Sequence, residues 1–225
     1  MENVNLQDET RHKLIQAAGE IFAEAGYQNA TVREICARAG ANVAAVNYHF
    51  GDKLGLYTEL LKTAAGAGEV PAIEHTLRAP TPEEALRRFL HAMFQQMTRA
   101  DRPSWYMKVM AHEIAQPTEA LPAVVKHVIK PKAQVLCSIV GRLIGRPAMD
   151  PKTRRCAHSI MGQVLHYKHA RPVIALLWPD FKSTPIEEVA DHVTEFSLEA
   201  LKGIRLKARP SVVKKTAVAK KRRSK

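Results

Sequence analysis

The side chains that carry out covalent chemistry occur in this sequence, but not at the spacings that known reactions need. His112 and Glu113 begin the pattern of a zinc protease, yet Gln116 stands where the second histidine is required. The sequence contains neither a glycine-rich phosphate loop nor a Gly-x-Ser-x-Gly nucleophile turn. We therefore expect neither an enzyme nor a cofactor.

Four potential metal ligands lie near one another in the second half of the chain. His166 and His169 are three residues apart on a predicted helix and could share a metal ion with Cys156 or His158. Exposed or hydrogen-bonded histidines are, however, more common in proteins than histidines that bind a metal. We predict no metal site.

The helical pattern of residues 43–50 separates an apolar side from a side suited to contact with DNA. At 100° per residue, Val43, Val46 and Phe50 share the side that should pack inward. The opposite side and its flank carry small, polar and aromatic residues, namely Ala44, Ala45, Asn47, Tyr48 and His49. Small side chains let a backbone approach base edges, and asparagine can pair with adenine or bond to a phosphate.

Two short helices with a tight turn between them are predicted to position this surface. Thr31 can cap the first helix, and Glu34 three residues later completes a capping box. Gly40 supplies the positive φ at which a helix commonly stops. Asn42 can cap the second helix, which ends before Gly51. Two helices at this spacing form a helix-turn-helix.

A further helix is predicted just before this motif. It covers residues 8–25, with Asp8 as its cap and Gly26 as its end. Its apolar residues recur at helical spacing, which indicates that one side of the helix packs against the motif.

Residues 8–60 resemble the DNA-binding domain of the TetR family of bacterial regulators. The resemblance rests on IFAEAGY at 21–27, the helix start TVREI at 31–35, and NYHFGDK at 47–53. It implies a homodimer that binds a palindromic operator in double-stranded DNA, and an all-α fold.

The resemblance also implies roles for individual residues. Thr31 and Arg33 are expected near the phosphate backbone, and Lys53 resembles a lysine that meets a phosphate near a helix N-terminus. Asn47 stands where the family commonly has a tyrosine, so its role does not follow from the family.

The rest of the chain is predicted to be helical, because no alternating strand pattern competes. Segment 66–82 is expected to hold a loop or short helix and to mark a domain boundary. The third body helix is expected to be broken by Pro117, Pro122 and Pro131. The predicted body helices are 82–98, 104–115, 124–144, 151–170 and 185–204.

Two segments of the body, 105–118 and 160–172, resemble the CecR-like subgroup of TetR regulators. In the family, the last two long helices pair across a two-fold axis. We expect that interface to use Ile160, Val164, Leu165, Val189, Val193, Phe196 and Leu201.

Soft and aromatic side chains are frequent in the body. Core packing is the ordinary interpretation for each of them, but the family precedent favours a cavity for a small-molecule effector, whose identity is unknown. The candidate lining residues are Met93, Met97, Trp105, Tyr106, Met110, Met161 and Tyr167.

The net charge of +12 is concentrated at the C-terminus. Residues 205–225 contain ten Lys or Arg and no Asp or Glu, whereas residues 1–62 have six basic and eight acidic side chains. DNA binding by the helix-turn-helix therefore depends on placed groups and not on bulk charge. The tail is too polar to fold alone, and it is either a solvated extension or a non-specific DNA grip.

Three widely spaced cysteines indicate reduced thiols, and the sequence shows neither a signal peptide nor a long apolar run. We expect a cytoplasmic bacterial protein associated with the nucleoid, without contact to a membrane. Its predicted parts are a DNA-binding domain (1–62), an effector-binding and dimerisation domain (63–205) and a basic tail (206–225).

The predicted function is sequence-specific transcriptional regulation, with a repressor released by a small molecule as the first hypothesis. A DNA-architectural protein that uses the basic tail without an effector is the second. An enzyme with an appended DNA-binding domain is the third.

Overall fold

Helices joined by short turns make up the protein. The computed structural model describes residues 2–98, 103 and 105–208, among which no strand occurs. The longer helices are α1 (Glu2–Asn29), α2 (Val32–Ala39), α3 (Val43–Phe50), α4 (Lys53–Ala64), α6 (Pro82–Thr98), α7 (Trp105–Ala115), α9 (Lys130–Ile144), α10 (Pro151–His169) and α12 (Ile186–Ala208). The prediction of an all-α fold is confirmed.

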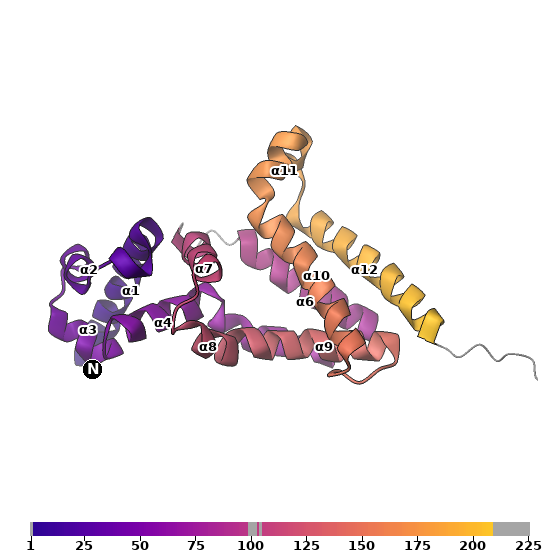
Figure 1. The fold of residues 1–225 in the computed structure, drawn as a ribbon, viewed down its shortest axis with the longest axis horizontal. Helices are drawn as coiled ribbons and strands as arrows, with labels where there is room; N and C mark the ends of the chain where they lie inside the picture. Colours follow the sequence, from indigo (N-terminus) through magenta and orange to yellow (C-terminus); the bar gives the residue numbers. More distant parts are fainter. Residues whose placement is uncertain (1, 99–102, 104, 209–225) are drawn as a thin grey trace, which may run out of the picture.

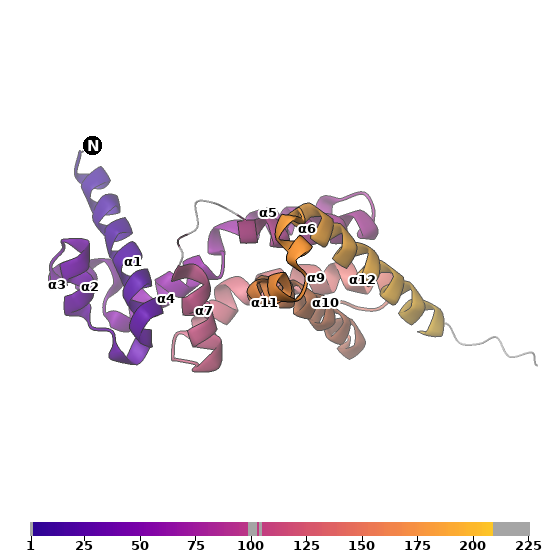
Figure 2. The ribbon, with the colours of Figure 1, turned by 90° about the horizontal axis from the view of Figure 1, so that it is seen from above.

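The helices form two groups along an elongated molecule. In both views, α1 to α4 lie at one end, while α6, α9, α10 and α12 form the other (Figure 1; Figure 2). The short elements are η1 (Ala67–Glu69), α5 (Val70–His75), η2 (Thr76–Arg78), α8 (Leu121–Val124), η3 (Val125–Ile129), α11 (Arg171–Leu177) and η4 (Pro179–Ser183).

The first helix is longer than predicted. α1 begins at Glu2, because no glycine or proline precedes Asp8, so Asp8 lies inside the helix and does not cap it. Gly26 has a left-handed φ of 73°, and helical geometry resumes after it as far as Asn29. The expected stop at Gly26 is therefore a kink.

Buried side chains at the N-terminal end form a first core, which we call the head cluster. It contains residues of the first four helices together with residues of α7 and α8. The residues from α7 are Trp105, Tyr106 and Val109. The indole N–H of Trp105 donates a hydrogen bond to Gln16 Oε1 of α1 at 3.2 Å. Although the predicted boundary follows residue 62, the packing attaches α7 to the helices before it.

A second core, the body cluster, lies between α5, α6, α9, α10 and α12. Five of the seven residues predicted at the dimer interface are buried in it, namely Ile160, Val164, Val189, Val193 and Leu201. That part of the prediction is wrong, since these side chains face their own chain. Leu165 and Phe196 remain exposed.

The third body helix is not broken at Pro131. α8, η3 and α9 follow one another without a gap, and η3 is a π-helical turn directly before Lys130 and Pro131. Because proline has no N–H to donate, a local change in hydrogen-bond spacing lets the helix accommodate it. In the described part of the chain, no helix is long and apolar enough to cross a membrane.

Candidate nucleic-acid interface

The N-terminus of α2 has the predicted capping box. The Glu34 N–H donates to Thr31 Oγ1 at 3.2 Å, and the Thr31 N–H donates to Glu34 Oε2 at 3.0 Å. Hydrogen bonds from the side chain and backbone of Thr31 lower the pKa of the Glu34 carboxyl. Gly40 ends α2 with a φ of 63°, so the tight turn is built as predicted.

The second helix of the motif is also capped as predicted. The side chain of Asn42 accepts a hydrogen bond from the Ala45 N–H at 2.9 Å. Val46 is completely buried, whereas Tyr48 is 71% exposed. The rings of Tyr48 and His49 meet edge to face, with their centres 5.0 Å apart. Because Val46 is buried and Tyr48 is exposed, α3 is anchored on one side and open on the other.

Most of the predicted DNA-binding residues lie on the surface. Thr31, Arg33, Asn42, Ala44, Asn47 and Tyr48 are exposed, while Ala45, His49 and Lys53 are half-buried. The structure brings these nine residues together at one end of the molecule, on α2, α3, their caps and the start of α4.

Two positions on α3 differ from the prediction. Val43 was expected to pack inward but is 44% exposed, and Ala45, which was placed on the open side, packs against the head cluster. Helical side chains tilt toward the N-terminus. The side chain of Val43, the first residue of α3, therefore extends past the end of the helix.

Lys53 begins α4 directly after the capping residue Asp52, whose side chain accepts from the Gly55 N–H at 2.7 Å. Its ammonium group lies 4.6 Å from the centre of the Tyr27 ring and donates to the Gln28 carbonyl at 3.3 Å. Burial lowers the pKa of Lys53. This predicted phosphate ligand is thus held at the end of α1 and is not free in solvent.

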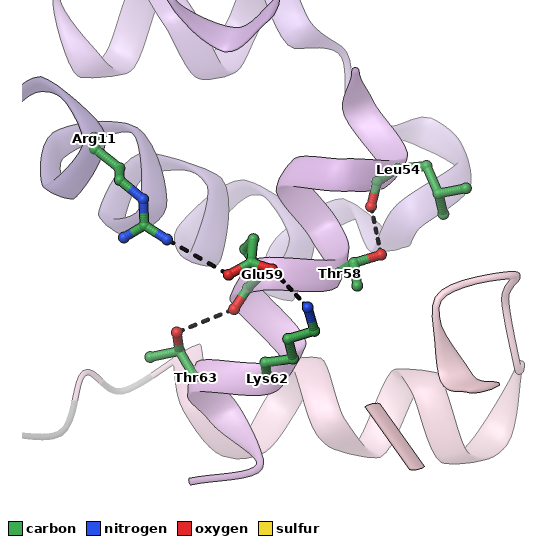
Figure 3. A network of polar contacts seen from close by, with 6 residues as sticks. All are labelled: Arg11, Leu54, Thr58, Glu59, Lys62 and Thr63. Carbon is green, nitrogen blue, oxygen red and sulfur yellow. Dashed lines mark hydrogen bonds and ion pairs between the residues drawn. The ribbon is translucent and has the colours of Figure 1, made fainter. Parts of the chain in front are cut away.

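Two arginines near the motif pair with glutamates. Arg38 lies 3.5 Å from Glu20 and 3.4 Å from Glu24 of α1, so it braces α2 against α1. Arg11 points from α1 toward Glu59 of α4, with a nitrogen-to-oxygen distance of 3.5 Å (Figure 3).

Arg11 is a basic group that the sequence analysis missed. Its guanidinium lies 5.5 Å from the centre of the Phe50 ring at the end of α3. It borders an open depression of about 480 Å³ that His49 and Asp52 also line. The pattern of residues 31–53 does not indicate Arg11, because this side chain reaches the motif from another helix.

The predicted pocket residues are divided between the two cores. Trp105, Tyr106 and Met110 belong to the head cluster, whereas Met93, Met161 and Tyr167 border the body cluster. The side chain of Met97 lies outside the described part of the chain. The six described residues therefore do not line one cavity together.

A capped two-helix motif with an exposed second helix, joined to a helical body, defines a helix-turn-helix transcriptional regulator. The model of bacterial regulatory proteins of the tetR family matches residues 14–60, and that of the C-terminal domain of the HTH-type transcriptional dual regulator CecR matches residues 82–201. The chain belongs to the TetR family, with a CecR-type body, as predicted. It is a DNA-binding regulator and not an enzyme.

Individual relatives agree with this assignment. The dual regulator CecR of Shigella flexneri is 30% identical over 200 residues, which cover 83% of this chain and 89% of the relative. The repressor BepR of Brucella suis biovar 1 is 26% identical over 140 residues, covering 60% and 65%.

Solved structures share the fold. A transcriptional regulator from Pseudomonas aeruginosa PAO1 has a TM-score of 0.66 at 20% identity, covering 88% of this chain and 93% of its own. The regulator FadR from Bacillus subtilis, solved in complex with stearoyl-CoA, has a TM-score of 0.61 at 20% identity, covering 83% and 97%.

Proposed function

We propose that this protein is a repressor that binds a palindromic DNA operator as a homodimer and is released by a small-molecule effector. The observation that carries the proposal is the open side of α3, where Asn47 and Tyr48 stand clear of the head cluster. A short capped helix with small and polar exposed side chains suits entry into the major groove.

The residues of the interface divide into readers and phosphate contacts. Asn47, Tyr48 and His49 would meet base edges or phosphates, and Ala44 and Ala45 would allow close approach. Arg33 and Lys53 would contact the DNA backbone. Thr31 and Asn42 hold the N-termini of α2 and α3, where backbone N–H groups favour a phosphate.

A dimer is supported by large apolar side chains that remain exposed in the described part of the chain. They lie on α10, α11 and α12 and in the turn after α11: Leu165, Val173, Leu176, Leu177, Trp178 and Phe196. Exposed apolar side chains on helices that pack against one another, as α10 does with α11 and α12, favour an association site. Two copies are also what specific binding needs, because one helix-turn-helix reads only a short half-site.

The effector would bind in the body. Tyr167 lies near Phe94 and Phe181, with ring centres 6.1 Å and 6.0 Å away, and Met93 and Met161 border the same cluster. Methionine and aromatic side chains can adapt to an apolar ligand. The complex of the Bacillus subtilis regulator with stearoyl-CoA makes an acyl-chain ligand a reasonable first probe.

The proposal divides the chain into a DNA-binding domain (1–62), an effector-binding and dimerisation domain (63–205) and a basic tail (206–225). It places the protein in the cytoplasm, associated with the nucleoid. Residues 209–225 lie outside the described residues. The competing function is a DNA-architectural protein that depends on this tail and has no effector.

Selection of bound duplexes from random DNA tests the proposal. A repressor yields a palindromic consensus, and a screen of small molecules against that complex then finds one that releases the protein. Binding without a consensus would favour the architectural function instead.

A further inference from the structure

A lysine of the body, Lys132 on α9, is buried. Only 8% of it is exposed, and among the described Lys and Arg residues it is the one that is buried. Burying an ammonium group is costly unless it is hydrogen bonded or paired with a negative charge. Neither the proposed DNA contact nor the proposed effector site uses Lys132, so its burial calls for another role.

The ammonium group of Lys132 lies at the C-terminal end of α4. It donates a hydrogen bond at 2.9 Å to the carbonyl of Ala65, the residue that caps α4. It also lies 3.7 Å from Glu69 Oε2 of η1. The carbonyl groups at the C-terminus of a helix carry partial negative charge and favour a cation. Lys132 therefore caps α4 and pairs with the element that follows it.

The turn after α4 leaves room for this ammonium group. Gly66, which connects α4 to η1, has a left-handed φ of 78°. A Cβ added to Gly66 would lie 2.8 Å from the Lys132 Nζ, closer than real Cβ contacts allow. Glycine at this position therefore permits both the turn and the approach of Lys132 to the Ala65 carbonyl.

Lys132 connects the two cores of the molecule. On α4, Leu60 and Leu61 are buried in the head cluster. On α9, the residues that follow Lys132, Val135 and Leu136, are buried in the body cluster. In both views α4 lies between the first three helices and the rest of the molecule (Figure 1; Figure 2). A bond from α9 to the end of α4 therefore restricts the angle between α4 and the body.

A small change in this angle produces a large displacement at the DNA. α4 has 12 residues, so it is about 18 Å long. Tilting a helix of this length by about 10° at one end moves its other end by about 3 Å, close to the rise of one base pair, about 3.4 Å. The other end of α4 begins at Lys53, directly after α3 and its turn.

We infer that Lys132 determines which half-site spacing the protein accepts, because it fixes the tilt of α4 and with it the separation of the two α3 helices in a dimer. The inference rests on the proposed homodimer and its palindromic operator. The Tyr106 hydroxyl also donates to α4, at the Thr63 carbonyl, but Tyr106 belongs to the head cluster. Its bond therefore stays within the head cluster, whereas the bond from Lys132 comes from the body.

Duplexes with altered spacing test the inference. A palindromic operator is recovered by selection from random DNA, and its half-sites are placed at the selected spacing, one base pair closer together and one base pair further apart. The parent should lose about tenfold or more in affinity at each altered spacing. Lys132→Met keeps the length of the side chain but removes the ammonium group. Because α4 can then take several tilts, this variant should bind the selected spacing more weakly and lose only about threefold or less at the altered ones.

Two further variants separate spacing from a general loss of structure. Lys130→Met changes an exposed lysine on the same helix, so it is the matched control and should keep the parent's preference. Removing one member of a buried pair leaves the other charge uncompensated. If circular dichroism shows that Lys132→Met is unfolded, Lys132→Met combined with Glu69→Gln takes its place, because both charges of the pair are then removed.

The outcomes are distinct. A weaker preference for the selected spacing in the Lys132 variant supports the inference. If that variant binds all three duplexes more weakly by one common factor, or keeps the parent's preference, Lys132 is only structural and the inference is overturned while the proposed function stands. A parent that binds the three spacings equally overturns the inference as well. If selection yields no palindrome, the proposed function fails and the inference fails with it.

Discussion

Trp105 of α7 lies directly against Gly19 of α1. A Cβ added to Gly19 would be 2.2 Å from the indole ring, so the close packing of the two helices depends on the missing side chain. Because this contact joins a later helix to the head cluster, it fixes α7 relative to the DNA-binding motif.

The substitution Gly19→Ala should therefore lower the free energy of unfolding by about 1–3 kcal/mol, the usual cost of overpacking. Gly203→Ala on α12 is the matched control, since nothing lies within 4 Å of its added Cβ. There the helix preference of alanine should raise the free energy of unfolding by up to about 1 kcal/mol. Urea unfolding measures the free energy of unfolding of both variants. An equal change in the two variants would contradict the close contact between Trp105 and Gly19.

The proposed dimer contact is tested at Phe196, which is 59% exposed on α12. Phe196→Glu should give folded monomers in sedimentation and reduce operator binding below detection, because a charge replaces an apolar contact. Met149→Glu is the control, as Met149 is 62% exposed in the turn between α9 and α10. A Phe196→Glu protein that remains dimeric would exclude this surface.

The stability at alkaline pH should depend on Tyr57. Its folded-state pKa is raised above the ordinary value of 10.0, so its contribution to stability is complete below that value and is lost as the pH rises above it. One such group gives a slope of at most about 1.4 kcal/mol per pH unit. Tyr57→Phe should flatten the fall in urea stability above about pH 10, and an unchanged fall would mean that Tyr57 titrates normally.

The basic tail should add affinity but no specificity. Deleting residues 207–225 removes nine positive side chains. Positive charge binds any phosphate backbone by releasing counterions, whatever the base sequence. Binding to operator and to scrambled duplexes should weaken by a similar factor, most clearly at low salt. A loss confined to the operator would mean that the tail reads sequence, for example in the minor groove.

Local features of the site could be predicted because neighbouring residues encode them. Thr31 with Glu34 and Asn42 with Ala45 form caps within one helical turn, and Gly40 sits at the turn. The hydrogen bond from the Trp105 indole to Gln16 could not be predicted, since it joins residues far apart in the sequence. No periodic pattern marks such a pair.

The same limit applies to the surface of the body. Helical spacing placed Val193 and Phe196 on helix 185–204, but spacing does not tell which side meets the chain's own core. The structure buries Val193 and exposes Phe196. Only the packing of α6 and α9 against α12 shows which side of this helix stays free for a partner.

Binding of the selected operator by Tyr48→Ala and Lys53→Ala tests most directly whether α3 reads DNA. Both variants should fold and bind the operator about tenfold or more weakly, and Lys53→Ala should also reduce the salt slope by about one. Tyr48→Ala should lose more affinity for the operator than for a scrambled duplex. If both folded variants bind the operator like the parent, the placement of α3 in the groove is wrong.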